Sequence, residues 1–486
     1  MTAPFPNTPT FTGYDAPSRI EGDVYDLEIL GDLPAGLDGA FYRVGPDPQY
    51  PPRLGDDIYI SGDGMVSMFR FENGHVDFRQ RYVRTARFLA ERKARRSLFG
   101  AYRNAYTDDP AVARVSRGVA NTTPVWHGGR LLILKEDSLP YELDPVTLAT
   151  RGVFDWGGRL KTRTVTAHPK IDPETGELLF YGYEASGDGS TDMAFCVADA
   201  SGELVREEWF KAPYAAMVHD FAITRDHVIF PIFPAVVDMN RVKAGGPHWM
   251  TDNRLQAYIG IMPRRGGVKD IRWFPREACH AFHMINAWSE GDTVHLDLSV
   301  AQACPFPYIP DVSGAPYDPR ASAPIPTRWT FDLSRNDDQF EERVIGAFSG
   351  DVPRIDDRRA GLPYRYAYMG MVDPTRPMQK SGPVGAGFNQ VGQIDLEAGT
   401  TNVWYGADTD TFQEPQFIPT GPEEDDGYVV AVIDRHGENR SDVGVFDARA
   451  FARGPVAIIR LPLRLRGAFH GTWIPGAELP VTDWSV

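Results

Sequence analysis

Residues 166–184 read TAHPKIDPETGELLFYGYE and carry the two signals that decide the fold of this protein. The sequence from Asp172 to Gly176 is a turn signal, because proline presets φ and glycine accepts positive φ. The run ELLFYGYE at 177–184 follows, rich in the aromatic and apolar residues that favour strands. The stretch therefore predicts a tight turn that leads into a β-strand, with His168 just ahead of it.

Similar strand-like runs recur in both directions along the sequence, and turn residues separate them. The runs lie at 64–71, 130–136, 177–184, 227–233, 293–300, 327–333, 402–406, 428–434 and 443–449. Because neither a linker nor a shift in composition interrupts them, we predict one all-β domain over residues 1–486. A propeller suits such a protein, and seven blades would average about 69 residues each. No repeat of that period is visible, so the runs alone leave the blade number open.

One long segment, RTARFLAERKARRSLFGAYRN at 84–104, instead fits a helical period, and we expect that helix to end at Gly100. Its basic side chains are compatible with a membrane or nucleic-acid contact, or with a solvated helix face that covers a β core. The protein has 66 acidic and 50 basic side chains, and its net charge of -16 repels phosphate backbones and anionic lipids. The segment is therefore predicted to be a helical lid, and we expect neither nucleic acid nor a membrane as partner.

The N-terminal residues lack a basic start followed by an apolar run, and no apolar stretch is long enough to span a membrane. We therefore expect a cytoplasmic protein. Cys196, Cys279 and Cys304 are too few and too dispersed for a disulfide framework or a thiolate metal site.

The eleven histidines are the most informative polar residues, because neutral imidazole binds iron, copper, zinc and nickel. Three stand beside turn residues and are predicted at the surface: His75, His127 and His436. Four others have small, apolar or aromatic neighbours, as a buried axial position requires: His168, His219, His283 and His470.

The gaps between these four histidines are 51, 64 and 187 residues. At about 65 residues per blade they correspond to one, one and three blades, so four blades of a propeller could each bring one histidine to the axis. Spacing alone leaves His280 and His295 open as alternatives.

The sequence resembles the carotenoid cleavage oxygenase superfamily along almost its whole length. The matching segments are FYRVGPDPQYPP (41–52), GDGMVSMFRF (62–71), KEDSLPYELDP (135–145), TAHPKIDPETGELLFYGYE (166–184), MVHDFAIT (217–224), FHMINAW (282–288), QEPQFIP (413–419) and AFHGTWIP (468–475). The resemblance implies a seven-bladed β-propeller with a helical and loop dome over the active-site face. It also implies that four histidines bind Fe(II): His168, His219, His283 and His470. Four neutral imidazoles leave two octahedral positions open, so O2 is expected as co-substrate and no organic cofactor is expected.

The resemblance further places a carboxylate behind three of these histidines, to orient each ring through its second N–H. The matching residues are Glu136, Asp351 and Glu414. Asp351 departs from the family pattern, which has glutamate there. Because its side chain is shorter, we expect a bridging water or a backbone shift at this position.

Two segments resemble the phenylpropenoid-cleaving branch, which contains the lignostilbene dioxygenases and the isoeugenol and 4-vinylguaiacol oxygenases. SLFGAYRNAYTDDP (97–110) contains Tyr102, and LLILKEDSLPYELDP (131–145) contains Lys135. Taken alone they would be an ordinary loop tyrosine and strand lysine; the resemblance implies that they bind the 4-hydroxyl of the substrate. An ammonium and a phenol at that place favour the phenolate. The alkene of the substrate would then be cleaved oxidatively, giving a 4-hydroxybenzaldehyde such as vanillin.

Three further residues are expected in the substrate pocket. Thr122 resembles the family residue that crowds one open iron position, and Ile60 stands where stilbene cleavers can carry an aromatic ring. Phe306 is expected as a pocket wall or as a plain core residue. Losing the ring at Ile60 removes a stacking surface for a second aryl group, which favours isoeugenol or 4-vinylguaiacol. A hydroxystilbene is the alternative, followed by an apocarotenoid; oligomeric state and the origin of the product oxygens stay open.

An alternative hypothesis assigns the protein to a different functional class. In it, the propeller lacks a metal or binds calcium, and it serves as a binding module or a lactone hydrolase. Its candidate feature is the acidic stretch at 423–426. The spacing of these carboxylates does not match a calcium loop and is typical of a solvated surface loop.

Overall fold

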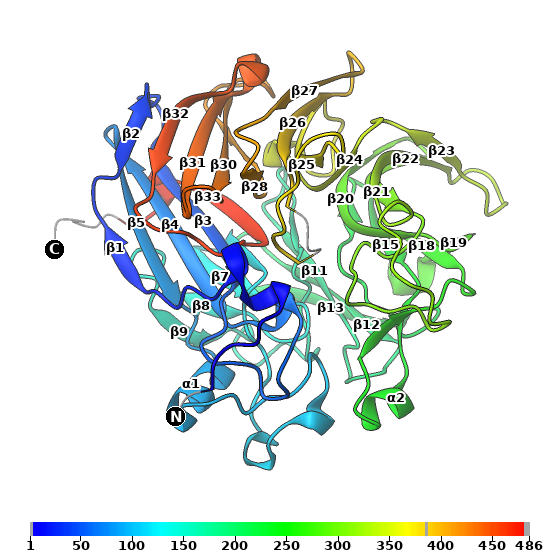
Figure 1. Ribbon diagram of the computed structural model, residues 1–486. Coiled ribbons are helices and arrows are strands. Elements are labelled where there is room, and N and C mark those ends of the chain that lie inside the picture. The colour runs from blue at the N-terminus through cyan, green and yellow to red at the C-terminus, as the bar shows by residue number, and fades with distance from the viewer. Residues whose placement is uncertain (1–2, 384–386, 481–486) are drawn as a thin grey trace.

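Seven β-sheets surround a common axis in the computed structural model, which describes residues 3–383 and 387–480 (Figure 1). All strand pairs within these sheets are antiparallel, and the architecture is the predicted seven-bladed β-propeller. Five blades have four strands each. In chain order, the first two of these blades consist of β6 (Thr123–His127), β7 (Arg130–Leu134), β8 (Tyr141–Leu143) and β9 (Thr150–Val153), and of β10 (Lys170–Ile171), β11 (Leu178–Tyr183), β12 (Asp192–Ala198) and β13 (Leu204–Lys211). The next two consist of β14 (Ala222–Ile223), β15 (His227–Ile232), β18 (Ala257–Pro263) and β19 (Arg272–Arg276), and of β20 (His280–Glu290), β21 (Thr293–Ala301), β22 (Ile325–Asp332) and β23 (Glu341–Val344). The fifth consists of β24 (Ser349–Ile355), β25 (Tyr366–Val372), β26 (Gln390–Asp395) and β27 (Thr400–Trp404).

The other two blades close the ring, because each contains strands from both ends of the polypeptide. The first blade has the order β1 (Gly22–Val24), β5 (His75–Tyr82), β4 (Gly64–Glu72), β3 (Gly39–Pro46) and β33 (His470–Pro475). The last has the order β2 (Glu28–Gly31), β32 (Pro455–Arg460), β31 (Arg440–Asp447), β30 (Gly427–Arg435) and β28 (Asp410–Phe412), with β29 (Gln416–Pro419) also paired to β30. Strand β33 pairs with β3 and strand β2 pairs with β32, so backbone hydrogen bonds join both ends of the polypeptide into the ring.

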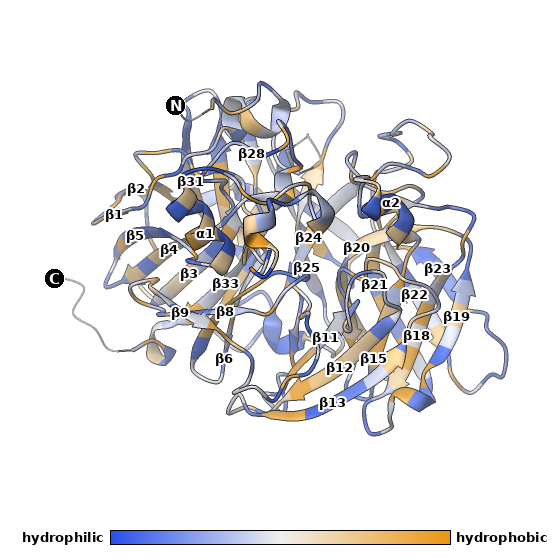
Figure 2. Ribbon diagram, turned by 90° about the horizontal axis from the view of Figure 1, so that it is seen from below, coloured by the Kyte–Doolittle hydropathy of each residue, from blue (hydrophilic) through white to orange (hydrophobic). Residues whose placement is uncertain are grey.

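Apolar clusters between neighbouring blades form the core. On β11, Phe180 packs in one cluster with Leu132 of β7, and the next residue, Tyr181, packs in another with Phe230 of β15. Successive side chains thus face two different blades, which explains why the sequence of an inner strand is continuously apolar. The outer strand β13 is partly exposed and mixes hydrophobic with charged residues, whereas β12 beside it is largely hydrophobic and buried (Figure 2).

Helix α1 (Ala86–Ala94) confirms the predicted helical segment but is shorter than expected. The side chain of Thr85 caps its N-terminus by accepting from the Phe88 N–H, and Arg95 ends it in the left-handed conformation with φ 55°. Beyond it, the Glu91 carboxylate accepts hydrogen bonds from the N–H groups of Leu98 and Phe99. The expected end at Gly100 was therefore wrong, because a side chain satisfies the backbone donors that a longer helix would have used.

The remaining elements are short. Helix α2 (Met239–Lys243) lies beside the two-stranded sheet of β16 (Ala235–Val237) and β17 (Trp249–Thr251). Single 3₁₀ turns occur at η1 (Pro9–Phe11), η2 (Gly13–Asp15), η3 (Tyr59–Ser61), η4 (Ala105–Thr107), η5 (Pro110–Val112), η6 (Val268–Asp270), η7 (Asp357–Arg359), η8 (Ala448–Arg453) and η9 (Gly476–Glu478). Both α-helices project from the same end of the molecule (Figure 1). Within the described residues, no helix has the length and apolarity that a membrane span needs.

Candidate metal centre

Four histidines reach the propeller axis from four different blades. His168 lies just before β10, His219 just before β14, His283 within β20, and His470 at the start of β33. Along the ring, successive histidines are one, one and three blades apart, the separations that the sequence gaps indicate. We call this group the histidine tetrad.

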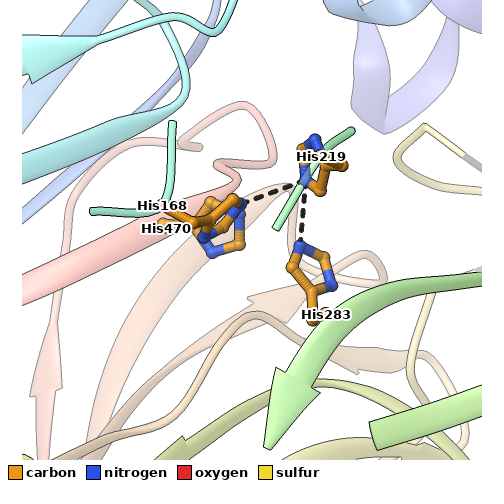
Figure 3. A group of neighbouring side chains, drawn as sticks. All are labelled: His168, His219, His283 and His470. Carbon is orange, nitrogen blue, oxygen red and sulfur yellow. Dashed lines mark hydrogen bonds between the residues drawn. The ribbon is translucent and has the colours of Figure 1, made fainter. Parts of the chain in front are cut away.

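The four imidazoles point toward one another (Figure 3). The Nε2 atoms of His168 and His219 are 3.0 Å apart, and those of His219 and His283 are 3.3 Å apart. One ligand atom from each of the four rings lies within 4.8 Å of the others. The alternatives His280 and His295 instead bond to Asn253 and Thr330.

A carboxylate binds the outer nitrogen of three of these rings, and each comes from one of the three blades that supply no histidine. Nδ1 of His219 is 2.5 Å from Glu136, Nδ1 of His283 is 2.9 Å from Asp351, and Nδ1 of His470 is 2.8 Å from Glu414. Every blade therefore contributes one polar residue to the axis.

Electrostatics hold two of these carboxylates, Glu136 and Glu414, in the ionised form. Burial alone would raise the pKa of Glu136, but His219 and, more weakly, Lys135 lower it to about 2. Burial alone would also raise the pKa of Glu414, but His470 and Arg354 outweigh burial and lower it. Ionised carboxylates only accept hydrogen bonds, so Nδ1 of His219 and Nδ1 of His470 donate, and the Nε2 of each ring presents a lone pair to the centre.

The donor set fits a divalent transition metal. The Nε2 atoms of His168, His219 and His283 converge at 3.0–3.3 Å, so one cation can be held between their rings. Burial and the neighbouring rings also lower the pKa of His168 well below its ordinary value, which keeps this imidazole neutral. Neutral imidazole binds iron, zinc, copper or nickel, and the three carboxylates orient the rings from behind.

Asp351 contacts His283 directly, so the backbone makes up for its shorter side chain. The pairing of β24 with β25 shifts register between Asp351 and Arg354, which marks a β-bulge. Within the bulge Val352 has φ 50°, a conformation that β-branched residues rarely adopt. Of the two expected solutions, a bridging water or a backbone shift, the structure shows the backbone shift.

The tetrad separates two cavities. A cavity of about 140 Å³ is lined by three of the four histidines, His219, His283 and His470, together with Lys135 and Glu136. A larger cavity of about 690 Å³ is lined by His168, again with His283 and His470. His283 and His470 thus border both cavities. We call the smaller one the inner cavity.

The three predicted pocket residues all line the inner cavity: Ile60, Thr122 and Phe306. The ring of Phe306 meets Phe282 edge to face at a centroid distance of 4.0 Å, and Phe282 lies 4.8 Å from the His219 ring. Thr122 donates to the Asn121 side chain, whose amide in turn donates to the carbonyl of Ile60. Phe306 is therefore a pocket wall as well as a core residue.

Lys135 and Tyr102 lie together at one end of this site. The Lys135 ammonium is 5.2 Å from the centroid of the Tyr102 ring. Lys135 lines the inner cavity, and Tyr102 packs in the same apolar cluster as Phe306 and Tyr308. The Tyr102 hydroxyl is buried without a hydrogen-bond partner among the described residues, an unusual state for a buried donor. Burial and the charges of Glu136 and Asp137 raise its pKa well above the ordinary value, so it stays a neutral donor.

Sequence reasoning missed several residues of the site. Met217, Phe282 and Tyr308 line the inner cavity. The sequence holds a signal for Phe282 and Met217, because Phe282 stands one residue before His283 and Met217 two residues before His219.

Two surface predictions for histidines were wrong. His75 is exposed as expected, but His127 is buried and lies 2.9 Å from the Gly176 carbonyl, and His436 is half-buried against Tyr14. His127 ends strand β6 and His436 lies in the turn after β30, and neighbouring segments cover both.

The acidic stretch at 423–426 does not form a cation site. Glu424 pairs with Arg359, and Asp425 and Asp426 both pair with Arg449. These arginines neutralise the carboxylates, as expected of a surface loop.

Comparisons with known proteins agree with this geometry. The family model described as retinal pigment epithelial membrane protein matches residues 15–475. Isoeugenol monooxygenase of Pseudomonas nitroreducens is 46% identical over 473 residues, which cover 96% of this chain and 98% of that protein. The crystal structure of Pseudomonas brassicacearum lignostilbene dioxygenase superposes with a TM-score of 0.94 at 45% identity, covering 98% of this chain and all of that one. Cobalt-substituted Synechocystis apocarotenoid oxygenase gives a TM-score of 0.81 at 27% identity over 94% of this chain and 97% of that one. The protein therefore belongs to the retinal pigment epithelial membrane protein family, the carotenoid cleavage oxygenases.

Proposed function

We propose that the protein is an Fe(II)-dependent, O2-dependent enzyme that cleaves the alkene double bond of 4-hydroxyphenyl alkenes. Its substrates are of the isoeugenol or 4-vinylguaiacol type, and its products are 4-hydroxybenzaldehydes such as vanillin. One observation carries the proposal: Lys135 lines a cavity walled by three tetrad histidines, and the ring of Tyr102, whose buried hydroxyl is unpartnered among the described residues, lies 5.2 Å from its ammonium. The 46% identity to an isoeugenol monooxygenase supports it.

The histidine tetrad would hold the ferrous ion, with His168, His219, His283 and His470 as ligands. Bound there, iron supplies the redox chemistry that activates dioxygen. Glu136, Asp351 and Glu414 keep three of the rings in one tautomer and one orientation. They also place three negative charges near the divalent cation, which strengthens its binding.

Lys135 and Tyr102 would bind the substrate 4-hydroxyl. The ammonium favours the phenolate by its charge, and the neutral Tyr102 hydroxyl donates a hydrogen bond to it. Phenolate formation pushes electron density through the ring into the conjugated alkene. Without such a partner both polar groups would be buried at a cost, which argues against a hydrocarbon polyene as substrate.

Lys135 and the tetrad share one cavity. Glu136 binds a ring of the tetrad, and the residue before it supplies the phenol-binding ammonium. His219, His283 and His470 line the same cavity as Lys135. A phenol held at Lys135 would therefore place its alkenyl group in the space that the metal position borders, which makes bound geometry a part of catalysis.

The walls of the inner cavity keep water away from the reacting alkene. Phe282, Phe306 and Tyr308 line one part, and Ile60 and Phe388 line another. Aromatic faces and edges accommodate a phenyl ring, and exclusion of water strengthens the phenolate interactions.

Cavity size favours a short alkenylphenol over a stilbene. Identities of 46% to an isoeugenol monooxygenase and 45% to a lignostilbene dioxygenase do not separate the two. The inner cavity of about 140 Å³ lies below the volume of about 300 Å³ and more that drug-sized ligands occupy. Ile60 at its wall offers no aromatic face to a second ring. A hydroxystilbene is the second candidate, supported by the TM-score of 0.94 to the lignostilbene enzyme.

A substrate panel tests the proposal. Purified protein loaded with Fe(II) under air receives isoeugenol, 4-vinylguaiacol, a 4-hydroxystilbene and an apocarotenal, and aldehyde products are identified by chromatography. We expect vanillin from the first two, at higher kcat/KM than for the stilbene. The 4-O-methyl ether of isoeugenol is the matched control and should react poorly. Equal turnover of the ether, or cleavage of the polyene alone, would contradict the proposal.

We also propose that the protein works in the cytoplasm on a small phenolic partner. Its three cysteines are buried and unpaired, which fits a reducing compartment. Location of the tagged protein by cell fractionation tests this, and recovery from a secreted fraction would overturn it.

A further inference from the structure

A buried ionic cluster lies directly behind Tyr102. Arg103, the next residue, pairs with Glu184, and its other terminal nitrogen donates to the Tyr183 hydroxyl at 2.9 Å. His248 joins the pair, with Nε2 3.1 Å from Glu184. The side chains of Arg103, Glu184 and His248 are 4%, 1% and 0% exposed. Removing three ionisable groups from water is costly, so a purely structural cluster is weakly favoured at best.

The cluster fixes the backbone on which Tyr102 stands. Nδ1 of His248 donates to the Arg103 carbonyl at 3.0 Å. The Asn104 amide donates to the carbonyls of Val242 and Gly246, both at 2.8 Å. The two residues after Tyr102 are thereby attached to the segment that contains α2, at the foot of the molecule in Figure 1.

Hydrogen bonds hold both ring nitrogens of His248. Burial alone would raise the pKa of Glu184, but Arg103 and His248 outweigh it and hold that pKa below the ordinary value. Nδ1 of His248 lies against the Arg103 carbonyl and Nε2 against the Glu184 carboxylate, so one ring joins the backbone after Tyr102 to the ion pair.

Backbone strain accompanies the cluster. Arg103 has φ 52° and Glu184 has φ 48°, so both partners of the ion pair adopt the left-handed conformation. That conformation costs free energy in residues other than glycine and persists only where surrounding contacts enforce it. Such strained residues concentrate at functional sites.

We propose that Arg103, Glu184 and His248 form a positioning unit that aims the Tyr102 hydroxyl at the substrate 4-hydroxyl. The inference rests on the proposed function, because it deepens the role of Tyr102. The unit touches neither substrate nor metal; it acts through Tyr102, and its effect is selectivity for free 4-hydroxyphenyl alkenes over their ethers.

A double-mutant cycle tests the proposal. His248→Gln keeps an amide that can donate to the Arg103 carbonyl but removes the ring and its bond to Glu184. In the otherwise wild-type holoenzyme we expect kcat/KM for isoeugenol to fall about tenfold, mainly through KM, as coupled neighbours do. Turnover of the 4-O-methyl ether and iron content should stay unchanged. In the Tyr102→Phe background, His248→Gln should lower kcat/KM for isoeugenol by less than about twofold, because the hydroxyl that His248 helps to position is gone.

Controls separate positioning from folding. His127→Gln changes another buried histidine, which bonds a single backbone carbonyl, and should leave kcat/KM and selectivity unchanged. If His248→Gln does not fold, Glu184→Gln in the same two backgrounds replaces it. Thermal melting of each variant reports stability independently of turnover.

The outcomes distinguish this inference from the proposed function. If His248→Gln lowers kcat/KM for isoeugenol equally with and without the Tyr102 hydroxyl, the positioning unit is overturned and the proposed function still stands. If Tyr102→Phe alone leaves isoeugenol turnover and its preference over the ether unchanged, the phenol-binding role fails and the positioning unit fails with it.

Discussion

At the scale of single residues, the site divides into groups that contact the tetrad and groups that only line the inner cavity. Lys135 and Glu136 are neighbours in the sequence, and both line the inner cavity, but Glu136 contacts His219. Their side chains can be changed separately, because they bind different partners.

Replacing Lys135 with methionine keeps most of the side-chain length and removes the ammonium. We expect Lys135→Met to retain iron, because all three carboxylate–histidine contacts remain. Turnover of isoeugenol should fall by about two orders of magnitude, since a buried charge interaction with the phenolate is lost. Iron is measured by elemental analysis and turnover by vanillin formation. Wild-type rates would discredit the phenolate role of Lys135.

At the scale of an element, strand β24 shows how backbone geometry makes up for a side chain. Asp351 is one methylene shorter than the glutamate expected there, and the bulge with Val352 in the left-handed conformation brings it to His283. In an ordinary strand, alanine is more stabilising than glycine. At position 352, where φ is 50°, we expect glycine to be more stabilising than alanine.

This reversal is measurable by comparing Val352→Gly with Val352→Ala. Both remove the same branched side chain, so the difference between them reports the backbone. We expect the glycine variant to unfold with a free energy about 1 kcal/mol higher than the alanine variant, because glycine adopts positive φ without a Cβ clash. Chemical denaturation of the apo-proteins measures it. An alanine variant that is equally stable would show that the bulge is unstrained.

At the scale of the whole molecule, the metal position and the closure of the ring coincide. His470 begins β33, the strand that the C-terminal region adds to the first blade, and the other tetrad histidines lie in three further blades. A metal that binds all four therefore ties together blades that otherwise meet only through neighbours.

Removing iron should lower the stability of the whole propeller. A ligand that binds only the folded state adds about 2.7 kcal/mol at a concentration 100 times its Kd. We expect a chelator to lower the Tm of the wild-type protein and iron to restore it. His283→Ala should neither retain iron nor show the shift. A Tm that is insensitive to iron, with iron demonstrably bound, would argue that the metal does not link the blades.

A buried polar contact between the last and first blades gives the free energy of unfolding a defined pH dependence. Asp434 on β30 accepts hydrogen bonds from Gln413 and Tyr14, and Gln413 also accepts from Arg43 on β3. Burial raises the pKa of Asp434 to about 6, although Gln413 and Arg43 oppose it. The folded state thus binds this proton more tightly than the unfolded state does.

The sign follows from linkage: stability from this group is present at low pH and is lost as pH rises from about 4 to about 6. The loss amounts to about 3 kcal/mol for two pKa units. Asp434→Asn should flatten the stability curve across that window, as measured by denaturation at several pH values. An unchanged slope would show that Asp434 ionises in the folded state as easily as in the unfolded one.

The sequence by itself was enough for the class of the fold and for a small set of candidate axial histidines. Turn signals and strand-like runs are local, so they can be read without knowing what packs where. The apolar and aromatic neighbours of His168, His219, His283 and His470 are local as well, and only residues with such flanks suit an axial position. The resemblance to the family supplied the blade number, which the unrepeated sequence left open, and it selected these four histidines over His280 and His295.

Only the tertiary structure decided which groups meet. The end of α1 depends on the reach of one Glu91 carboxylate, the contact of Asp351 depends on a bulge that pairing with β25 imposes, and burial of His127 depends on a segment about fifty residues away. The cluster of Arg103, Glu184 and His248 joins three distant parts of the sequence, and none of the three carries a local signal. The physical reason is shared: propensities act over a few residues, whereas contacts, burial and charge pairing depend on where long-range packing places each segment.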